Sequence, residues 1–333
     1  MRRHDPEEDS RHDFPVALPA RDIRLEVRGP LTIRRIDNFL SQRYGQLSRA
    51  QYQKLIKAGR VSVNGRAVNV SYRLNPRDVL EFQLPAQTPR VIPPREMPLA
   101  ILYEDAHVLA INKPPGIMCH PGKKLTDDTL ASGLIHHIYG DELGPHNPGI
   151  VHRLDYDTSG VMVVAKTPEA HVAMSQQFEK RTVRKEYLAL VRGAISKRFG
   201  QIAAPIGYHT GRYGLMSVAA DAAQARPALS AYEVRERFAG HTLVSVVPKT
   251  GRRHQIRVHF ESIGHPLIGE KHYRGGLSPD PLEEIMPRLA LHAWKLSLTH
   301  PVSGRPLELT AELPADFAAV LAHLRSAEPP AGP

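Results

Sequence analysis

HRLDYDTSG, residues 152–160, gathers a histidine, an arginine, two carboxylates and two hydroxyls beside a glycine, and continues directly into the apolar run VMVVAK, residues 161–166. The apolar run predicts a buried strand. Polar groups at the mouth of a buried strand are a place where a scaffold presents reactive side chains. A loop rich in Asp, Thr and Ser is also common turn chemistry. The residues alone therefore leave a functional site and a plain turn equally open.

Short apolar runs alternate with helical segments from Leu99 onward. ILYEDAHVLAINK (101–113) predicts two strands about a turn, and PEAHVAMSQQFEKR (168–181) predicts a helix that begins at Pro168. Further strand-like runs are EYLALVRG (186–193), ALSAYEVRERF (228–238), TLVSVVP (242–248) and LALHAWKLSLTHP (289–301). The pattern predicts an α+β fold with a large mixed, mainly antiparallel sheet flanked by helices. Regular strand-helix-strand alternation is missing, which argues against a Rossmann fold or a barrel.

A smaller α+β unit is predicted over residues 31–85. Ile33, Ile36, Phe39 and Leu40 lie at helical spacing, and Ser48 with Gln51 has the spacing of a capping box that opens a second helix ending at Gly59. Asn64-Gly65 between valine-rich runs predicts a β-hairpin. Helix, helix and hairpin follow one another.

Positive charge is concentrated in this unit. The chain carries 44 Lys and Arg against 34 Asp and Glu, and residues 31–85 hold ten of the basic residues but only three acidic ones. Such an excess favours a polyanionic partner and suits a surface that follows phosphates. A charge run is more often only a solvated face, so both interpretations stand at this point. The basic side chains that we predict to contact RNA here are Arg49, Lys54, Lys57, Arg60 and Arg66.

The remaining segments delimit these two domains. Residues 1–30 are predicted to be a flexible leader, 86–98 a proline-rich linker, 99–325 the larger domain and 326–333 a flexible tail. The single cysteine, Cys119, cannot form an intrachain disulfide, which fits a reducing compartment. The sequence has no apolar run of the ~18 residues that a membrane span needs and no apolar signal core. We therefore expect a cytoplasmic protein that does not enter membranes.

Several segments resemble known families. RIDNFLSQRYGQLSRAQYQKLIKAGRVSVNGRAV (35–68) is similar to the alpha-L RNA-binding module of a small-subunit ribosomal protein and of several RNA-modifying enzymes. HRLDYDTSG resembles the signature loop of the RluA-type pseudouridine synthases. INKPPGIMCHP (111–121), RKEYLALVRG (184–193) and TGRRHQIRVHFESIGHPLIGEKHY (250–273) resemble further motifs of that family in order and spacing, and LHAWKLSLTHPVSGRPLELTAELP its C-terminal strands. The resemblance covers roughly Leu31 to Phe317.

The resemblance assigns roles to individual residues. It makes Asp155 the catalytic carboxylate, Arg257 the arginine that pairs with it, and Tyr187 the aromatic residue that faces the base. Arg153 becomes the arginine that helps to open the RNA around the target. Three positions depart from the residues often found in the family: Tyr156 in place of lysine, Asp128 in place of glycine and Glu270 in place of aspartate.

These residue types suit the isomerisation of uridine to pseudouridine. A carboxylate acts at the sugar only when ionised, and a neighbouring guanidinium can lower an Asp pKa by about one to three units. A structural ion pair is the alternative for Arg257, and core packing for Tyr187. The reaction needs no metal and no organic cofactor, and we expect none. The following histidines fall into no recognised ligand spacing and are expected to form structural hydrogen bonds: His120, His136, His137, His152, His254, His259 and His292.

The resemblance implies a monomeric RNA pseudouridine synthase whose partner is structured RNA, with large-subunit ribosomal RNA or its assembly intermediates favoured. Three alternatives remain open from the sequence. The chain could act on transfer RNA, serve as a non-catalytic RNA-binding ribosome-assembly factor on the same scaffold, or cleave uracil from RNA as a glycosidase.

Overall fold

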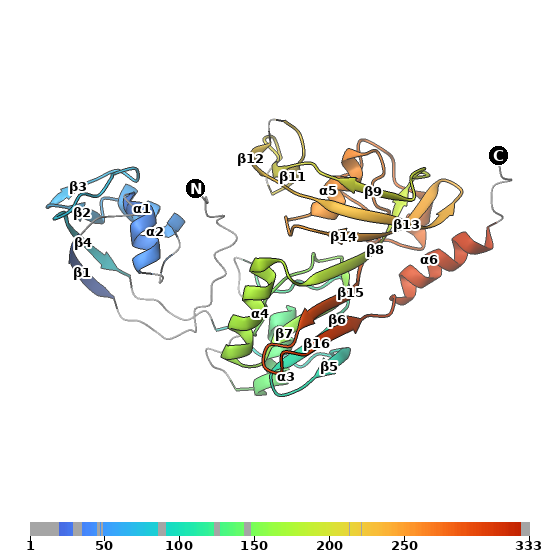
Figure 1. The fold of residues 1–333 in the computed structure, drawn as a ribbon, viewed down its shortest axis with the longest axis horizontal. Helices are drawn as coiled ribbons and strands as arrows, with labels where there is room; N and C mark the ends of the chain where they lie inside the picture. Colours follow the sequence, from blue (N-terminus) through green and yellow to red (C-terminus); the bar gives the residue numbers. More distant parts are fainter. Residues whose placement is uncertain are drawn as a thin grey trace. The chain divides into compact units, whose positions relative to one another are not determined.

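The computed structural model describes residues 20–28, 35–44, 47, 49–85, 91–122, 127–142, 148–212, 214–220 and 222–327. Among the described residues, the contacts divide the chain into two compact units, the first ending at Val91 and the second beginning at Ile92. Figure 1 shows the elements of both, coloured along the sequence. Within the described residues no helix is both long and apolar enough to span a bilayer.

The first unit packs two helices against a four-stranded sheet of order β1-β4-β2-β3. Its elements are β1 (Arg21–Glu26), α1 (Ile36–Arg43), α2 (Arg49–Lys57), β2 (Val61–Val63), β3 (Arg66–Ala67) and β4 (Val79–Leu84). Asn64 and Gly65 both have positive φ angles, 53° and 74°, as the predicted two-residue hairpin requires. The predicted helices and hairpin are confirmed, while Ser48 of the expected capping box lies outside the described residues.

The boundary of the predicted leader is wrong at one point. Residues 21–26, which the sequence predicts to be part of a flexible leader, form β1 and pair antiparallel with β4. Ile23 and Leu25 alternate with charged residues, a pattern too short to stand out in the sequence, and β4 supplies the hydrogen-bond partners that make it a strand. Residues 1–19, 29–30 and 328–333 lie outside the described residues.

The second unit is built on a nine-stranded sheet, which confirms the predicted α+β class with a large mixed, mainly antiparallel sheet. The strand order is β5-β6-β7-β15-β8-β14-β13-β9, with β16 paired to β15, and β7 with β15 is its parallel pair. The strands are β5 (Ile101–Glu104), β6 (Val108–Lys113), β7 (Ser159–Ala165), β8 (Arg184–Arg192), β9 (Phe199–Ile202), β13 (Ser230–Phe238), β14 (His241–Pro248), β15 (Leu291–Thr299) and β16 (Pro306–Thr310). A smaller sheet joins β10 (Ile206–Tyr208), β11 (Met216–Ser217) and β12 (Ala223–Arg226).

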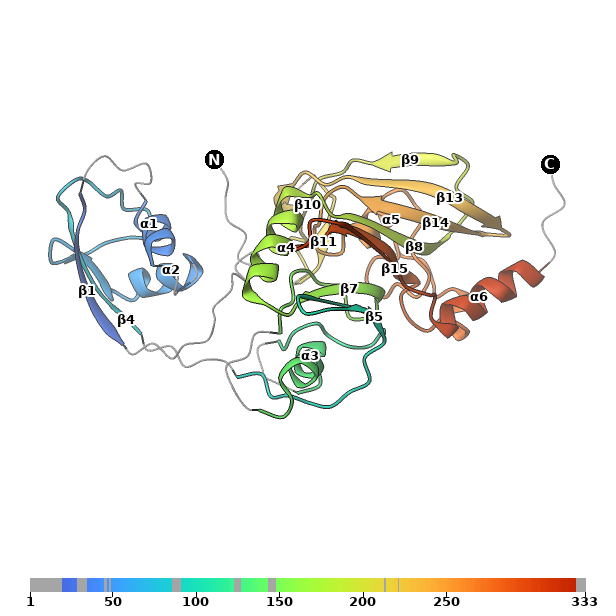
Figure 2. The same ribbon diagram turned by 60° about the horizontal axis from the view of Figure 1, so that its bottom comes forward.

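Helices cover both faces of this sheet (Figures 1 and 2). They are α3 (Leu130–Tyr139), α4 (Pro168–Lys180), α5 (Gln255–Ser262) and α6 (Ala315–Ser326), with a 3-10 turn at Pro281–Glu284. In β7, Val161 and Val163 pack on the side of α4, while Met162 and Val164 pack on the side of α3. A strand covered on both faces reads as an unbroken apolar run, which is what the sequence shows.

Strand β8 extends this layering across the sheet. Ala189 and Val191 share a core cluster with α5, and Leu188 and Leu190 share one with α6. Tyr187 contacts both the α5 cluster and the α3 cluster, so these two helices lie on one face of the sheet and their clusters meet at its side chain. The centre of that face is therefore the place at which the site is built.

The segment that we predict to be a linker makes contacts with the second unit. Residues 91–98 form no helix or strand. The Arg95 amide nevertheless donates to the Ser132 carbonyl, and Met97 lies so close to Gly133 that a Cβ there would stand 2.4 Å from its Cγ. The end of this segment thus packs on α3.

Candidate active site

Asp155 lies in the turn that leads into β7, and the backbone of this turn is held throughout. Four consecutive carbonyls, those of residues 154–157, each accept a hydrogen bond. Their donors, in order, are the Cys119 thiol at 3.3 Å, the Thr158 amide at 3.1 Å, the Gly116 amide at 2.9 Å with the Lys113 ammonium at 3.3 Å, and the Arg288 guanidinium at 3.0 Å. Because buried carbonyls without partners are costly, these bonds restrain the turn to one conformation.

The structure brings Arg257 to Asp155. Nη1 of Arg257 on α5 lies 3.4 Å from Oδ2 of Asp155, across 102 residues of sequence. Asp155 keeps 26% of its side-chain surface exposed, whereas Arg257 keeps 11%. The carboxylate is thus reachable from solvent while its cationic partner is enclosed.

Glu270 is the strongest partner of Arg257, and the sequence did not predict this. Nε and Nη2 of Arg257 donate to its two carboxylate oxygens at 2.6 and 2.8 Å, a bidentate pair with a fully buried acid. Burial alone would raise the pKa of Glu270, but the hydrogen bonds and charge of Arg257 outweigh burial and hold this pKa below its ordinary value. The sequence feature that set Glu270 apart was that glutamate stands where the family often has aspartate.

Tyr187, to which the resemblance assigns the base-facing role, lies on β8. Its ring is partly buried where the α3 and α5 clusters meet. Burial raises the pKa of its hydroxyl, and the negative charge of Asp155 raises it further. The hydroxyl therefore stays protonated at neutral pH.

A histidine and a tyrosine frame the other side of Arg257. His254 precedes α5 in the left-handed conformation, with φ of 53°, which non-glycine residues adopt at a cost. Its Nδ1 lies 2.7 Å from the hydroxyl of Tyr273, whose ring centroid lies 5.1 Å from the Arg257 guanidinium carbon. Burial lowers the pKa of His254, so the imidazole is neutral. Apart from the place of both residues in the motif at 250–273, nothing in the sequence indicates that His254 and Tyr273 lie beside Arg257.

Arg153 is exposed two residues before Asp155, on the same turn. Tyr156, one of the departures from the family pattern, is 55% exposed beside it. An arginine and an aromatic ring therefore stand on the rim of the turn. Both can meet a nucleic acid without moving the buried partners below.

Most of the histidines named above make hydrogen bonds inside the protein. His152 accepts from the Val163 amide at 3.0 Å and stacks on Phe178, with ring centroids 4.6 Å apart. His259 and His292 bond to Ser230 and Ser159, respectively. Within the described ranges, no group of three or more His, Cys, Asp or Glu side chains is arranged to hold a metal ion.

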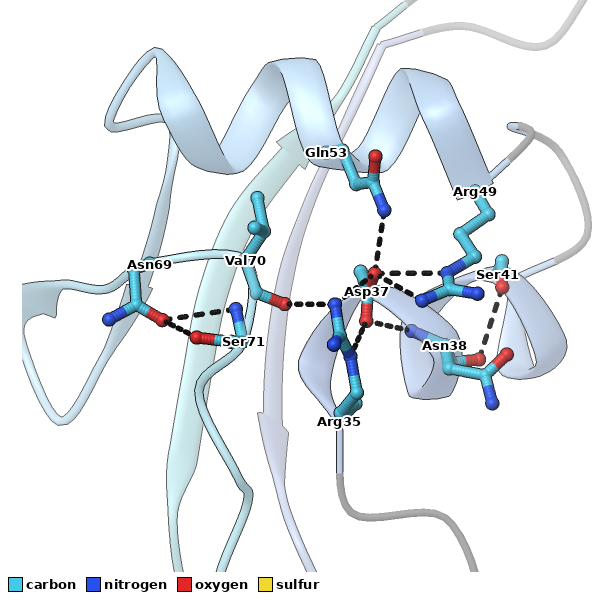
Figure 3. A network of polar contacts seen from close by, with 9 residues as sticks. All are labelled: Arg35, Asp37, Asn38, Ser41, Arg49, Gln53, Asn69, Val70 and Ser71. Carbon is cyan, nitrogen blue, oxygen red and sulfur yellow. Dashed lines mark hydrogen bonds and ion pairs between the residues drawn. The ribbon is translucent and has the colours of Figure 1, made fainter. Parts of the chain in front are cut away.

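In the first unit, Arg49 does not simply face solvent. Figure 3 shows the side chain of Asp37, which is fully buried, at the centre of a polar network. Its carboxylate accepts from Arg49 Nε and Nη2 at 2.9 and 2.8 Å, from Arg35 at 3.1 Å twice, and from Gln53 at 2.7 Å. Two cations around one anion leave a net positive charge. An arginine has five N–H donors, so Arg49 keeps further donors for a ligand.

The other basic residues predicted to bind RNA are exposed. Lys54 and Lys57 lie on the solvent side of α2, Arg60 follows the helix, and Arg66 is on β3. Arg35, which was not among the predicted RNA contacts, joins them through its hydrogen bonds to Asp37. The first unit thus presents cations from its second helix, the loop after it and the hairpin.

Comparison with known proteins agrees with these observations. The RNA pseudouridylate synthase family matches residues 107–262, and the S4 domain family matches residues 34–80. An uncharacterized RNA pseudouridine synthase of Synechocystis sp. is 38% identical over 298 residues, covering 89% of this chain and 90% of that protein. The ribosomal large subunit pseudouridine synthase D of Nitrosomonas europaea is 40% identical over 309 residues, covering 91% and 88%.

A solved structure supports the same assignment. Human RNA pseudouridylate synthase domain containing 4 superposes with a TM-score of 0.54 at 28% identity, covering 69% of this chain and 94% of that one. The chain therefore belongs to the RNA pseudouridine synthase family, with an N-terminal S4 domain, and is an isomerase that converts uridine to pseudouridine in RNA.

Proposed function

We propose that this enzyme modifies uridines of large-subunit ribosomal RNA and that Asp155 is its catalytic carboxylate. The contact between Asp155 and Arg257 carries the catalytic assignment, because it joins an accessible acid to an enclosed cation on a restrained turn. The substrate class is supported by relatives named ribosomal large subunit pseudouridine synthase D, at 37–40% identity over most of the chain. Transfer RNA remains the alternative substrate.

The chemistry divides among three side chains. The bond from the sugar's anomeric carbon to the base nitrogen breaks, the base turns, and C5 of the ring bonds to the anomeric carbon. C5 then loses its proton and the freed nitrogen gains one, so the reaction is an isomerisation. Asp155 acts on the sugar as nucleophile or base, and the Arg257 guanidinium lies 3.4 Å from its carboxylate. Tyr187 stacks on the extruded base, a contact worth about 1–3 kcal/mol.

Access to the base requires the nucleotide to leave its stack. This costs a few kcal/mol in a duplex and less in a loop. Arg153, exposed on the rim of the turn, fills the vacated space or holds a phosphate. The unstacking cost is one reason to expect a looped target.

The first unit supplies affinity for large RNA. We assign RNA binding to residues 31–85, catalysis to 99–325 and a connecting role to 86–98, and we expect a cytoplasmic monomer that meets ribosomal RNA during assembly. Replacing Lys54 and Lys57 by alanine, both exposed on α2, should weaken RNA binding and lower the slope of log affinity against log salt by about one for each phosphate that is no longer neutralised. An unchanged slope would contradict the assignment.

Asp155→Asn tests the catalytic assignment. We expect tritium release from RNA labelled at uridine C5 to fall by at least 10²-fold, on the order of a lost acid-base or nucleophilic group, while RNA affinity survives. Asp157→Asn, in the same turn, is the matched control and should remain active. Equal activity of wild type and Asp155→Asn would reject the assignment.

Two further outcomes separate the alternatives. Free uracil in the reaction would indicate a glycosidase, and RNA binding without any tritium release by the wild type would indicate an assembly factor. Pseudouridine mapping of ribosomal and transfer RNA, from cells with and without the gene, decides the substrate. Sites that disappear only from transfer RNA would overturn the ribosomal proposal.

A further inference from the structure

Arg288 holds the catalytic turn from a part of the chain that none of the motifs above includes. Its Nη1 donates to the Asp157 carbonyl at 3.0 Å and to the Leu289 carbonyl at 3.1 Å. Only 8% of the residue is exposed. A buried guanidinium thus ties the turn, two residues beyond Asp155, to the segment that enters β15.

The rest of this guanidinium is committed to the C-terminal helix. Nε and Nη2 of Arg288 donate to the two carboxylate oxygens of Asp316, at 2.6 and 2.8 Å. Asp316 lies in the first turn of α6, where its Oδ1 also accepts from the Phe317 amide at 2.7 Å. Phe317 and Leu321 of α6 are buried in the core against β8. The packing of α6 therefore fixes the position of Asp316 in the ion pair.

The backbone of Arg288 touches the other half of the catalytic pair. A Cβ on Gly269 would lie 2.0 Å from the Arg288 carbonyl oxygen. The two backbones therefore pack directly against each other, with no room for a side chain at position 269. Gly269 directly precedes Glu270, the bidentate partner of Arg257. Arg288 consequently contacts both the segment that carries Asp155 and the segment that orients Arg257.

We propose that Arg288 and Asp316 are positioning residues for catalysis, through which the C-terminal helix holds the turn that presents Asp155 to Arg257. This inference rests on the proposed role of Asp155. Neither side chain needs to touch RNA. Their effect is exerted through the Asp157 carbonyl and the Gly269 backbone.

The expected effect is on the rate of the chemical step. A reacting group displaced by about 1 Å can cost on the order of 10²-fold in rate. Hydrogen bonds from a charged donor are stronger than neutral ones, so losing this one loosens the turn more than an ordinary backbone bond would. Affinity for RNA depends on other residues and should change little.

The test compares three variants of the full chain. Arg288→Lys keeps a charge but cannot donate as a planar fork to Asp316 and to a carbonyl at once. Asp316→Asn keeps the shape of the side chain and removes the anion. Glu236→Gln is the matched control. Glu236 also forms a bidentate ion pair with an arginine, Arg325, at 2.8 and 2.6 Å. Arg325 lies at the C-terminal end of α6, whereas Asp316 lies in its first turn.

Single-turnover tritium release, RNA dissociation constants, thermal melting and amide hydrogen exchange are measured for each variant. We expect Arg288→Lys and Asp316→Asn to slow the chemical step on the order of 10²-fold at temperatures where they remain folded, with little change in dissociation constant. Amides of residues 156–160 should exchange faster in both. Glu236→Gln should match the wild type in rate and in exchange of these amides.

Three results would overturn the proposal. They are unchanged single-turnover rates despite lower melting temperatures, an equal loss in Glu236→Gln, and unchanged exchange in residues 156–160. If Asp155→Asn were as active as the wild type, the proposed function would fail instead. The exchange measurement, which needs no RNA and no activity, would then decide by itself whether Arg288 holds the turn.

Discussion

Arg257 donates two short hydrogen bonds to Glu270, at 2.6 and 2.8 Å, whereas its contact with Asp155 is single and measures 3.4 Å. The guanidinium is therefore oriented by the buried glutamate before any substrate arrives. Only Nη1 of Arg257 reaches Asp155, the proposed catalytic carboxylate. Asp155 therefore does not have to hold this cation in place. Glu270 is the residue on which this arrangement depends.

Glu270→Gln should lower both stability and activity. Removing one partner of a buried ion pair typically costs about 3–5 kcal/mol, because the other charge is left uncompensated. Denaturant unfolding measures the stability, and tritium release measures activity under conditions in which the variant is folded. Glu236→Gln, in an exposed bidentate pair with Arg325, should cost no more than about 1 kcal/mol. Equal costs at the two positions would contradict a special role for Glu270.

Tyr187 can be divided into ring and hydroxyl by two substitutions. Tyr187→Ala removes the stacking face and should weaken binding of the flipped nucleotide by about 1–3 kcal/mol, whereas Tyr187→Phe should keep that affinity. Equilibrium binding of an RNA with an unpaired target uridine measures this. If Tyr187→Phe lost as much affinity as Tyr187→Ala, stacking would be rejected. If Tyr187→Phe bound RNA as tightly as the wild type but had a slower single-turnover rate, the Tyr187 hydroxyl would be assigned a role in removing the proton from the uracil ring.

Asp37→Asn should weaken RNA binding although it makes the chain more positive. The buried carboxylate orients Arg35 and Arg49 through four hydrogen bonds, and an amide cannot accept from both guanidinium groups in the same way. The salt slope of binding should fall by about one for each phosphate that the two arginines no longer neutralise.

Asp78→Asn is the matched control for this prediction. Asp78 is also buried in the first unit, but its side chain accepts from Asn64, Tyr72 and the Asn75 amide and orients no arginine in the described part of the unit. Its loss should lower the melting temperature without the change in salt slope. Tighter RNA binding by Asp37→Asn would contradict the prediction, because simple charge addition would then explain the result.

Lys113→Met should change how stability depends on pH. Burial lowers the pKa of Lys113 from 10.5 to about 8, so between these values the unfolded chain binds more protons than the folded one, and stability rises with pH. The wild type should therefore gain on the order of 3 kcal/mol relative to Lys113→Met between about pH 8 and 10.5, at 1.36 kcal/mol per pKa unit. Unfolding by denaturant across this range measures the difference. A flat difference would show that the ammonium is not desolvated.

Local structure in this protein follows from residues that are close together in the sequence. Asn64-Gly65 specifies its hairpin because both residues tolerate positive φ. Pro168 begins α4 after Thr167, whose side chain accepts from the Ala170 amide. The apolar run that forms β7 predicts a buried strand, and all seven residues of β7 are buried. Each signal acts between neighbouring residues, and each prediction is confirmed. The alternation of charged and apolar residues in β1 did not by itself predict a strand. The hydrogen-bond partners of β1 come from β4, which lies more than fifty residues away in the sequence.

The way in which the site is held together depends instead on packing in three dimensions. The order β7-β15-β8-β14 places the turn of Asp155 beside α5, and motif resemblance alone could name Arg257 without revealing that Glu270 orients it. Arg288 and Asp316 carried no signal, since an arginine before a strand and an acid at a helix start are common. Their partners are set by the packing of α6, because an ion pair depends on distance in space and burial, neither of which sequence separation encodes.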